Sequence, residues 1–216
     1  FDIVAYTGNS TARTISHNLG SVPKAILIKN LVNGSAQWVV YHVGTGNTKA
    51  CYLNTTATPT STAGFFNNTT PTSSVFTLGT DTAVNGNGNA MIAYCFSDIQ
   101  GYSKFSTYEG NGNADGTFTY TGFKPAFLIV KPIDATDNWV MFDNKSLGFN
   151  SSTSPYNFYT NTNGAQTTDS GQLDFVSNGF KIRNGGGTVN KTSTYIYLAF
   201  AEEPFVASNY NVATAR

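Results

Sequence analysis

The stretch Tyr195-Ile196-Tyr197-Leu198-Ala199-Phe200-Ala201 is the strongest structural signal in the chain. Its aromatic and β-branched residues favour a strand because they pack well on a pleated surface. Ala25-Ile26-Leu27-Ile28 and Phe127-Leu128-Ile129-Val130 are continuous apolar runs, as expected of strands covered on both faces. No segment of a dozen residues has the period of an amphipathic helix. The sequence therefore predicts an all-β fold.

The same stretch has an earlier counterpart, because Ile92-Ala93-Tyr94-Cys95-Phe96 precedes the equivalent residues by about 104 positions. Further pairs recur in the same order, about 101 to 104 residues apart: Tyr6-Thr7-Gly8-Asn9 with Tyr108-Glu109-Gly110-Asn111, Val22–Lys29 with Lys124–Lys131, Gln37–Tyr41 with Asn138–Phe142, and Val75–Leu78 with Gly179–Ile182. A period of this length is the size of a small domain. We therefore expect two tandem homologous β-sandwich domains, jelly-roll-like, over residues 1–100 and 101–216.

The composition points away from nucleic acid and membrane partners. Charged residues make up 11% of the chain, with 12 Lys and Arg against 12 Asp and Glu. Nucleic-acid binding requires clustered cations, and no basic stripe is present. No apolar run is long enough to cross a bilayer as a helix. The first residue is Phe, which we interpret as the sign of a processed or partial chain. Low charge with abundant Thr, Gly and aromatic residues is typical of an extracellular or virion-surface β protein.

The reactive side chains do not form a recognisable catalytic motif. His17 and His42 lack counterparts in the second half, and we expect them to be satisfied by turn carbonyls. Cys51 and Cys95 are expected to be buried free thiols. The carboxylates lie mostly beside turn residues, where Asp closes turns. We therefore expect no enzyme activity and no cofactor.

A metal site is not indicated by any loop motif. No Asp-x-Asp-x-Asp-Gly loop is present, which excludes an EF-hand site. Calcium held by loop carbonyls with Asp134 or Asp137 stays open. The Gly-rich runs 85–89 and 185–187 lack the following helix of a phosphate cradle, so we interpret them as hairpin turns.

Two long polar stretches, 55–74 and 146–170, occupy the same place in each half and have no clear strand pattern. Long loops of this kind often carry function. Their aromatic residues are the candidates for binding a glycan or a protein partner: Phe65, Phe66, Tyr156, Phe158 and Tyr159. The alternative is that they pin each loop onto its own domain. Trp38 and Trp139 begin equivalent strands, which favours the core over a sugar platform.

The segments Leu173–Arg183 and Tyr195–Phe205 resemble uncharacterised repeats in tail-fibre-like proteins of tailed bacteriophages, marine ones especially. Residues 15–23 and 38–42 look similar to the first repeat of those proteins. The resemblance implies a virion component at the tail or another exposed surface. It supplies no catalytic or binding residue.

These observations predict a non-enzymatic structural module of a phage virion, part of a tail fibre or spike used for display or attachment to host-surface glycans. The expected partners are other virion proteins and copies of the chain itself, forming a homo-oligomer that is trimeric by analogy with fibres. The expected location is the virion surface, after synthesis in the host cytoplasm. The alternatives are a capsid decoration protein, a glycan-depolymerising enzyme and a subunit of a surface filament.

Overall fold

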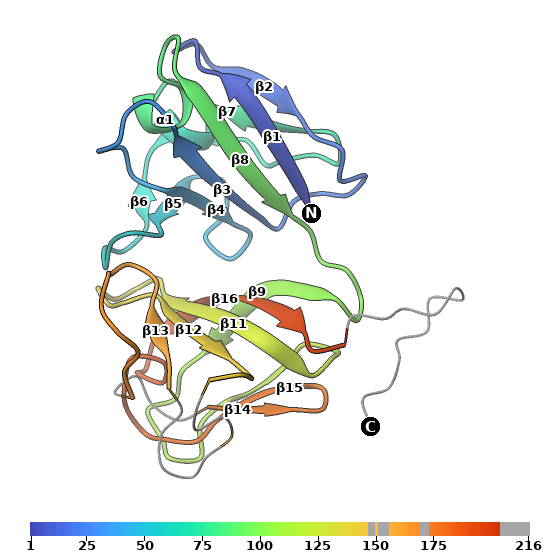
Figure 1. Cartoon of the computed structure of the whole chain (residues 1–216), viewed down its shortest axis with the longest axis vertical. Coiled ribbons are helices and arrows are strands. Elements are labelled where there is room, and N and C mark those ends of the chain that lie inside the picture. The colour runs from blue at the N-terminus through green and yellow to red at the C-terminus, as the bar shows by residue number, and fades with distance from the viewer. Residues whose placement is uncertain (147–149, 151–155, 169–172, 204–216) are drawn as a thin grey trace. The chain divides into compact units, whose positions relative to one another are not determined.

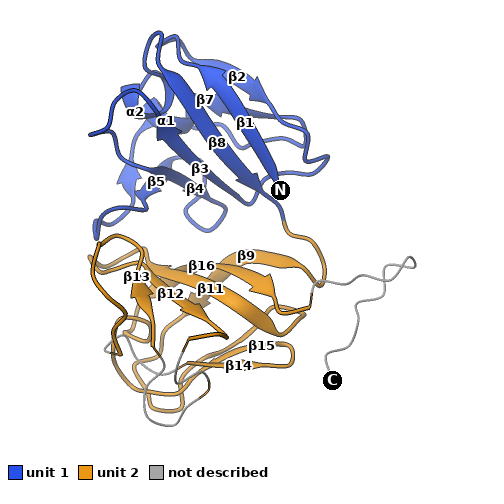
Figure 2. Ribbon diagram, viewed as in Figure 1, with its two compact units in different colours: residues 1–97 blue, residues 98–216 orange. Residues whose placement is uncertain are grey.

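The structure is a computed structural model that describes residues 1–146, 150, 156–168 and 173–203. It divides into two compact units, unit 1 from Phe1 to Ser97 and unit 2 from Asp98 to Arg216 (Figure 2). The division lies three residues before the expected one at residue 100. Within the described residues the regular secondary structure is almost entirely antiparallel β strand, which confirms the all-β prediction. No described helix has the length and hydropathy needed to span a membrane.

Unit 1 consists of two sheets and two helical turns (Figure 1). The large sheet has the strand order β1-β8-β3-β4-β5-β6, and β2 pairs with β7 in the small sheet. The elements are β1 (Asp2–Thr7), β2 (Arg13–Ser16), β3 (Ala25–Asn30), β4 (Val39–His42), β5 (Lys49–Tyr52), β6 (Thr60–Ser61), α1 (Ala63–Phe66), β7 (Val75–Leu78), α2 (Thr82–Asn85) and β8 (Ala90–Phe96).

Unit 2 repeats this plan. Among its described residues the large sheet has the order β9-β16-β11-β12-β13, and the small sheet has the order β10-β15-β14. The elements are β9 (Ser103–Glu109), β10 (Phe118–Tyr120), β11 (Pro125–Pro132), β12 (Val140–Asp143), β13 (Phe158–Tyr159), β14 (Leu173–Val176), β15 (Gly179–Ile182) and β16 (Thr194–Ala201). The order β1-β8-β3-β4-β5 thus matches β9-β16-β11-β12-β13 strand for strand.

Each unit buries its own core between its two sheets. In unit 1, Ile26 and Ile28 of β3 pack with Phe76 and Leu78 of β7. In unit 2 the core combines Leu128 of β11 with residues of both β14 and β15. The alternation of apolar residues on β7 and β15 explains this, because successive side chains of a strand point to opposite faces. The architecture of each unit is therefore β-sandwich-like.

The Gly-rich runs do not form hairpins, so that prediction is wrong. Residues 86–89 follow α2 in the connection from β7 of the small sheet to β8 of the large sheet, and residues 185–187 lie in the connection from β15 to β16. Both runs are therefore crossings between layers, since the strands on either side do not pair. The stretch 55–74 likewise contains β6 and α1 rather than loop alone.

The repeated Tyr-x-Gly-Asn motif holds these crossings in place through hydrogen bonds to a buried asparagine, an arrangement that we call the asparagine lock. In unit 1 the Tyr6 hydroxyl donates to the Val84 carbonyl oxygen at 2.7 Å, and the Asn9 backbone N–H donates to Asn85 Oδ1 at 3.0 Å. Asn85 Nδ2 donates in turn to Thr11 O at 2.9 Å and to Gly79 O at 2.8 Å. A buried side-chain amide with all these partners fixes the crossing to the end of β1.

The lock in unit 2 has the same contacts. The Tyr108 hydroxyl donates to Val189 O at 2.9 Å, and the Asn111 N–H donates to Asn190 Oδ1 at 3.1 Å. Asn190 Nδ2 donates to Asn113 O at 2.9 Å and to Asn184 O. Burial raises the pKa of Tyr108, which keeps its hydroxyl a neutral donor. The most evident repeat in the sequence is therefore part of the scaffold.

Candidate functional site

The outward face of the small sheet of unit 2 carries an unusual set of side chains. Phe118 on β10 lies opposite Lys181 on β15, and Lys181 lies opposite Asp174 on β14. In the next row Tyr120 lies opposite Gly179, and Gly179 opposite Val176. Residues directly opposite each other share a face of the sheet. Aromatic and charged side chains therefore stand together on this face, which we call the β10 face.

The two aromatic rings of the β10 face are open to solvent. Phe118 is 47% exposed and Tyr120 is 65% exposed, whereas Thr119 between them points inward and is 7% exposed. Across from Tyr120, a Cβ on Gly179 would lie 2.1 Å from the Thr119 carbonyl oxygen and 3.1 Å from a Phe118 ring carbon. Only glycine fits at that position, and Gly179 is itself buried beside the Phe118 ring.

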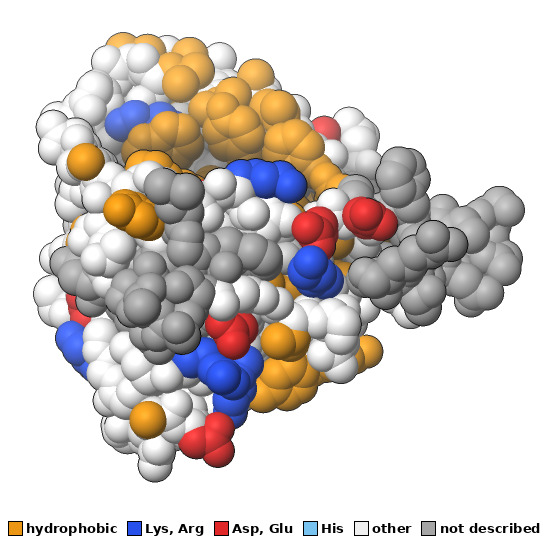
Figure 3. All heavy atoms as spheres, turned by 60° about the horizontal axis from the view of Figure 1, so that its bottom comes forward, with side chains coloured by type: hydrophobic (Ala, Val, Ile, Leu, Met, Phe, Trp, Pro, Cys, Tyr) orange, Lys and Arg blue, Asp and Glu red, His pale blue; other side chains and the backbone are white. Residues whose placement is uncertain are grey.

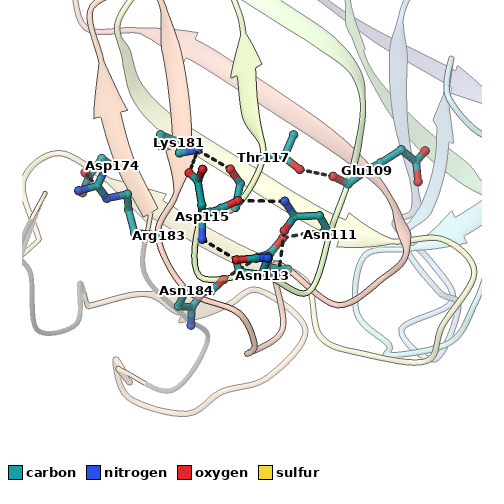
Figure 4. Close-up of polar contacts among 11 residues, drawn as sticks. Glu109, Asn111, Asn113, Asp115, Thr117, Asp174, Lys181, Arg183 and Asn184 are labelled. Atoms are coloured by element: carbon teal, nitrogen blue, oxygen red, sulfur yellow. Dashed lines mark hydrogen bonds and ion pairs between the residues drawn. The ribbon is translucent and has the colours of Figure 1, made fainter.

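The charges around the rings are paired (Figure 4). Lys181 Nζ lies 2.5 Å from Asp115 Oδ1 and also donates to the Gly116 carbonyl oxygen. Arg183 Nε lies 3.3 Å from Asp174 Oδ2. The hydrogen bond from Lys181 lowers the pKa of Asp115, so its carboxylate stays ionised in neutral solution. The β10 face thus offers donors and acceptors with no net charge from these two pairs.

The loop before β10 is built from a ladder of side-chain turns. Asn111 Oδ1 accepts the Asn113 N–H at 2.9 Å, and Asn113 Oδ1 accepts the Asp115 N–H at 3.0 Å (Figure 4). Asn111 Nδ2 donates to the Asp115 carbonyl oxygen at 3.0 Å. The Asn-x-Asn-x-Asp-Gly spacing provides alternating oxygens, as calcium loops do. Here these oxygens accept backbone N–H groups and Asp115 faces an ammonium, so the ladder shapes the loop.

The carboxylates considered for calcium are also engaged. Asp134 Oδ2 accepts the Thr194 N–H at 2.8 Å, and Asp137 pairs with Lys191 at 2.5 Å. In the described part of the chain no three His, Cys, Asp or Glu side chains gather in a group that could hold a metal ion.

The aromatic candidates of the long loops have different positions. Phe65 and Phe66 are core side chains of α1, 4% and 1% exposed, where they meet Tyr52 and Tyr41 edge to face. They therefore pin the segment onto unit 1 and present no surface to a ligand, which corrects their assignment as binding residues.

The candidates in unit 2 keep more contact with solvent. Tyr156 is 37% exposed. Phe158 and Tyr159 form β13 and are partly buried, with Tyr159 packed against the core. Most of the remaining stretch 146–170 lies outside the described residues. Tyr156 therefore stays a candidate, although it does not belong to the β10 face.

The histidines and cysteines are buried. His17 Nε2 lies 3.1 Å from the Thr72 carbonyl oxygen, as expected of a histidine satisfied by a turn carbonyl. His42 Nδ1 accepts the Gly44 N–H at 3.0 Å. Cys51 and Cys95 are free and buried, which confirms that prediction, and burial followed by the charge of Asp2 raises the pKa of Cys95 to about 12.

The tryptophans differ between the units. Trp139 is fully buried, whereas Trp38 is partly exposed and stacks on Tyr94 with the ring centroids 6.3 Å apart. The expectation of a core position thus holds for Trp139.

Phe118 and Tyr120 were not predicted from the sequence, although the two halves of the chain differ at these positions. The pairs Ile15–Phe76 and Thr119–Phe180 align the small sheets of the two units. Phe118 and Tyr120 then correspond to Thr14 and Ser16 of β2, which are exposed. Lys181 and Gly179 likewise correspond to Thr77 and Val75. The aromatic and charged residues are thus confined to unit 2, on a strand rather than in the diverged loops.

Residues 1–204 match a family described as a domain of unknown function (DUF7483). The chain belongs to this family. The match spans both units and ends close to the last described residue. No curated protein matches the chain, and no solved structure matches it.

Proposed function

We propose that the chain is a non-enzymatic structural module of a phage virion, part of a tail fibre or spike, and that unit 2 attaches to host-surface glycans through the β10 face. The single observation that carries the glycan part is the pair of exposed rings, Phe118 and Tyr120, beside paired charges. Aromatic rings stack on the apolar faces of sugar rings, while nearby charged groups bond to the hydroxyls. Unit 1 has Thr14 and Ser16 at the same positions, so the core does not require the rings.

We also infer that the two units are homologous β-sandwich domains of jelly-roll type that arose by duplication. The matching strand order and the shared asparagine lock support this inference. After duplication one copy is free to change its outward residues, because those residues bear little of the packing energy. Such a history accounts for a binding face in only one unit.

Binding to a panel of immobilised bacterial surface polysaccharides tests the glycan part. The Phe118→Thr, Tyr120→Ser double variant gives unit 2 the residues of unit 1, and should weaken binding of any captured polysaccharide by about tenfold or more. Tyr102→Ser removes another exposed aromatic, 37% exposed, and should leave binding unchanged. Unchanged binding in the double variant would contradict the assignment. Release of reducing ends from a bound polysaccharide would contradict a non-enzymatic role.

Location is tested separately. Gold-labelled antibodies against the chain, applied to purified particles of a phage that encodes it, should mark the tail. Labelling over the capsid would favour a decoration protein instead. Absence of the chain from the particles by mass spectrometry would overturn the virion assignment.

A further inference from the structure

The outermost strand of the large sheet of unit 1 has an open edge. Among the described strands, β1 pairs only with β8 (Figure 1). The Gly8 N–H donates to Asn89 O at 2.8 Å, and bonding alternates along an antiparallel pair. The even-numbered residues of β1 therefore bond to β8. The backbone groups of Ile3, Ala5 and Thr7 point away from it.

Only part of this edge is occupied. The Arg13 guanidinium donates to the Thr7 carbonyl oxygen. Within the described residues the backbone N–H and C=O groups of Ile3 and Ala5 have no hydrogen-bond partner. The Ile3 side chain is 52% exposed, and Ala5 is exposed as well. The free edge is therefore a short one, centred on Val4.

The corresponding edge in unit 2 is protected at the start of β9. Ser103 of β9 exchanges backbone hydrogen bonds with Ile99. The Phe105 N–H donates to Asp98 Oδ1 at 2.8 Å, and Asp98 also pairs with Lys104 at 2.9 Å. Charged side chains and short blocking segments are the usual protection of an edge strand. On β1, at the equivalents of Ser103 and Phe105, this protection is missing.

We propose that β1 pairs antiparallel with β1 of a second copy of this chain, with Val4 opposite Val4 of that copy. In this register the free groups of Ile3 bond to those of Ala5 across the two-fold axis, which forms four N–H···O bonds. Pairing Ala5 with Ala5 would set Ile3 against Thr7, whose oxygen already accepts from Arg13. Pairing Ile3 with Ile3 would set Ala5 against Phe1, which precedes β1. Of these three registers, only the Val4-centred one pairs all the backbone groups of Ile3 and Ala5 with each other.

Charge and exposed apolar surface fit the same partner. Asp2 is the single charged residue of β1, and its Oδ2 already accepts the Asn18 N–H at 2.7 Å. In the proposed register the two Asp2 residues lie about 13 Å apart along the strands. That exceeds the screening length of about 10 Å at 0.1 M salt. Phe1 is 55% exposed on the same outward face as Ile3 and stacks on Phe96 at 5.0 Å. The edge carries neither Lys nor Pro to oppose pairing.

This inference deepens the part of the proposed function in which copies of the chain assemble, and it rests on that part alone. It names the surface and commits to a two-fold dimer, in place of the trimer expected from fibres. Glycan binding and virion location are tested by other experiments, so a negative result there would not contradict pairing through β1. A negative result for β1 pairing would likewise not contradict glycan binding or virion location.

Sedimentation velocity of the full chain over a concentration series is the first test. The wild type should show a monomer–dimer equilibrium. Ala5→Lys should raise the dimer dissociation constant by about tenfold or more, because it puts an unpaired charge in the edge. Thr107→Lys changes the equivalent exposed residue of β9 and should leave the constant unchanged. A wild type that stays monomeric, a trimer, or a dimer indifferent to Ala5→Lys would overturn the proposal.

Disulfide trapping reads the register independently of the lysine variants. Residues opposite each other in a non-hydrogen-bonded antiparallel pair have Cα atoms about 4.5 Å apart, within the range of a disulfide. Val4→Cys should therefore give a covalent dimer under mild oxidation. Ala5→Cys should give little, since the two copies of residue 5 would be roughly 8 Å apart. The wild type, whose cysteines are buried, is the background. Stronger trapping at Ala5 than at Val4 would refute this register.

Discussion

The two units share a skeleton and differ in what the skeleton displays. Both contain the same order of strands in the large sheet and the same buried asparagine below a Tyr-x-Gly-Asn turn. Unit 1 has Thr14 and Ser16 on its small sheet and an open edge at β1. Unit 2 has Phe118 and Tyr120 at the matching positions, and Ile99 and Asp98 protect the start of its β9 edge. The comparison separates residues that hold the fold from residues available for contact.

The surface of the chain carries few charged side chains. Figure 3 shows a band of apolar side chains and only a few acidic and basic groups, several of them close together. Because only 11% of the residues are charged, uncharged polar side chains supply most of the polar surface. Contacts with copies of itself or with sugars then require little desolvation of charge.

The largest expected effect comes from the glycine of each lock. A Cβ on Gly8 would lie 2.1 Å from Gly86 O, and one on Gly110 would lie 2.0 Å from Lys191 O. Gly8→Ala and Gly110→Ala should each destabilise their own unit by about 4 kcal/mol or more, because backbone cannot move aside cheaply. Peptide-resolved hydrogen exchange assigns the loss to a unit. Gly34→Ala and Gly186→Ala, which meet open space, are the matched controls. A shared skeleton requires losses of similar size in both units.

Removing the buried amide should have the next largest effect. Asn85→Ala and Asn190→Ala each leave backbone donors and acceptors of the crossing unpaired, at a cost of about 3 kcal/mol. Chemical denaturation with hydrogen exchange as the readout measures this. Asn87→Ala, at an exposed residue of the same crossing, should cost little. A loss in one unit only would break the equivalence of the two locks.

One core position sharpens the comparison. Among the residues that the structure describes, buried Thr119 Oγ1 has no hydrogen-bond partner, whereas the matching residue of unit 1 is Ile15. Thr119→Val should stabilise unit 2 by about 1 kcal/mol, because it removes an unsatisfied hydroxyl at nearly constant volume. The thermal midpoint measures the change. A lower midpoint would mean that the hydroxyl has a role that its surroundings do not show.

Lowering the pH should reduce the folding stability of unit 2, and this effect should be the smallest of the four. The hydrogen bond and charge of Lys124 lower the pKa of Glu202, and Lys181 does the same for Asp115. A carboxyl whose pKa is lower in the folded state stabilises the fold above its unfolded pKa and loses that contribution as the pH falls through the folded value. Stability measured from neutral pH to about pH 3 should therefore fall less in Lys124→Met than in the wild type. Parallel curves would show that this pair contributes nothing.

Strands were the easiest part to predict, because apolar runs and alternation are local. Ala25–Ile28 lies within β3, Phe127–Val130 within β11, and Tyr195–Ala201 within β16. The Gly-rich runs were wrongly predicted to be hairpins, because a hairpin and a crossing between sheets use the same turn residues. Which of the two forms depends on the pairing of distant strands. Phe65 and Phe66 misled as well, because a helical turn inside a polar stretch has too few residues to show a period.

The sequence by itself determined the β class and the buried thiols, because composition and the alternation of apolar residues act over short ranges. Tertiary structure alone decided which shared residues form the lock. It also placed Phe118 and Tyr120 on an outward face, and left the edge of β1 open while Ile99 and Asp98 protect the start of β9. Each of these depends on register and on side chains brought together from distant segments. No local pattern encodes them, because pairing with residues about 60 to 100 positions away determines which face and which edge meet solvent.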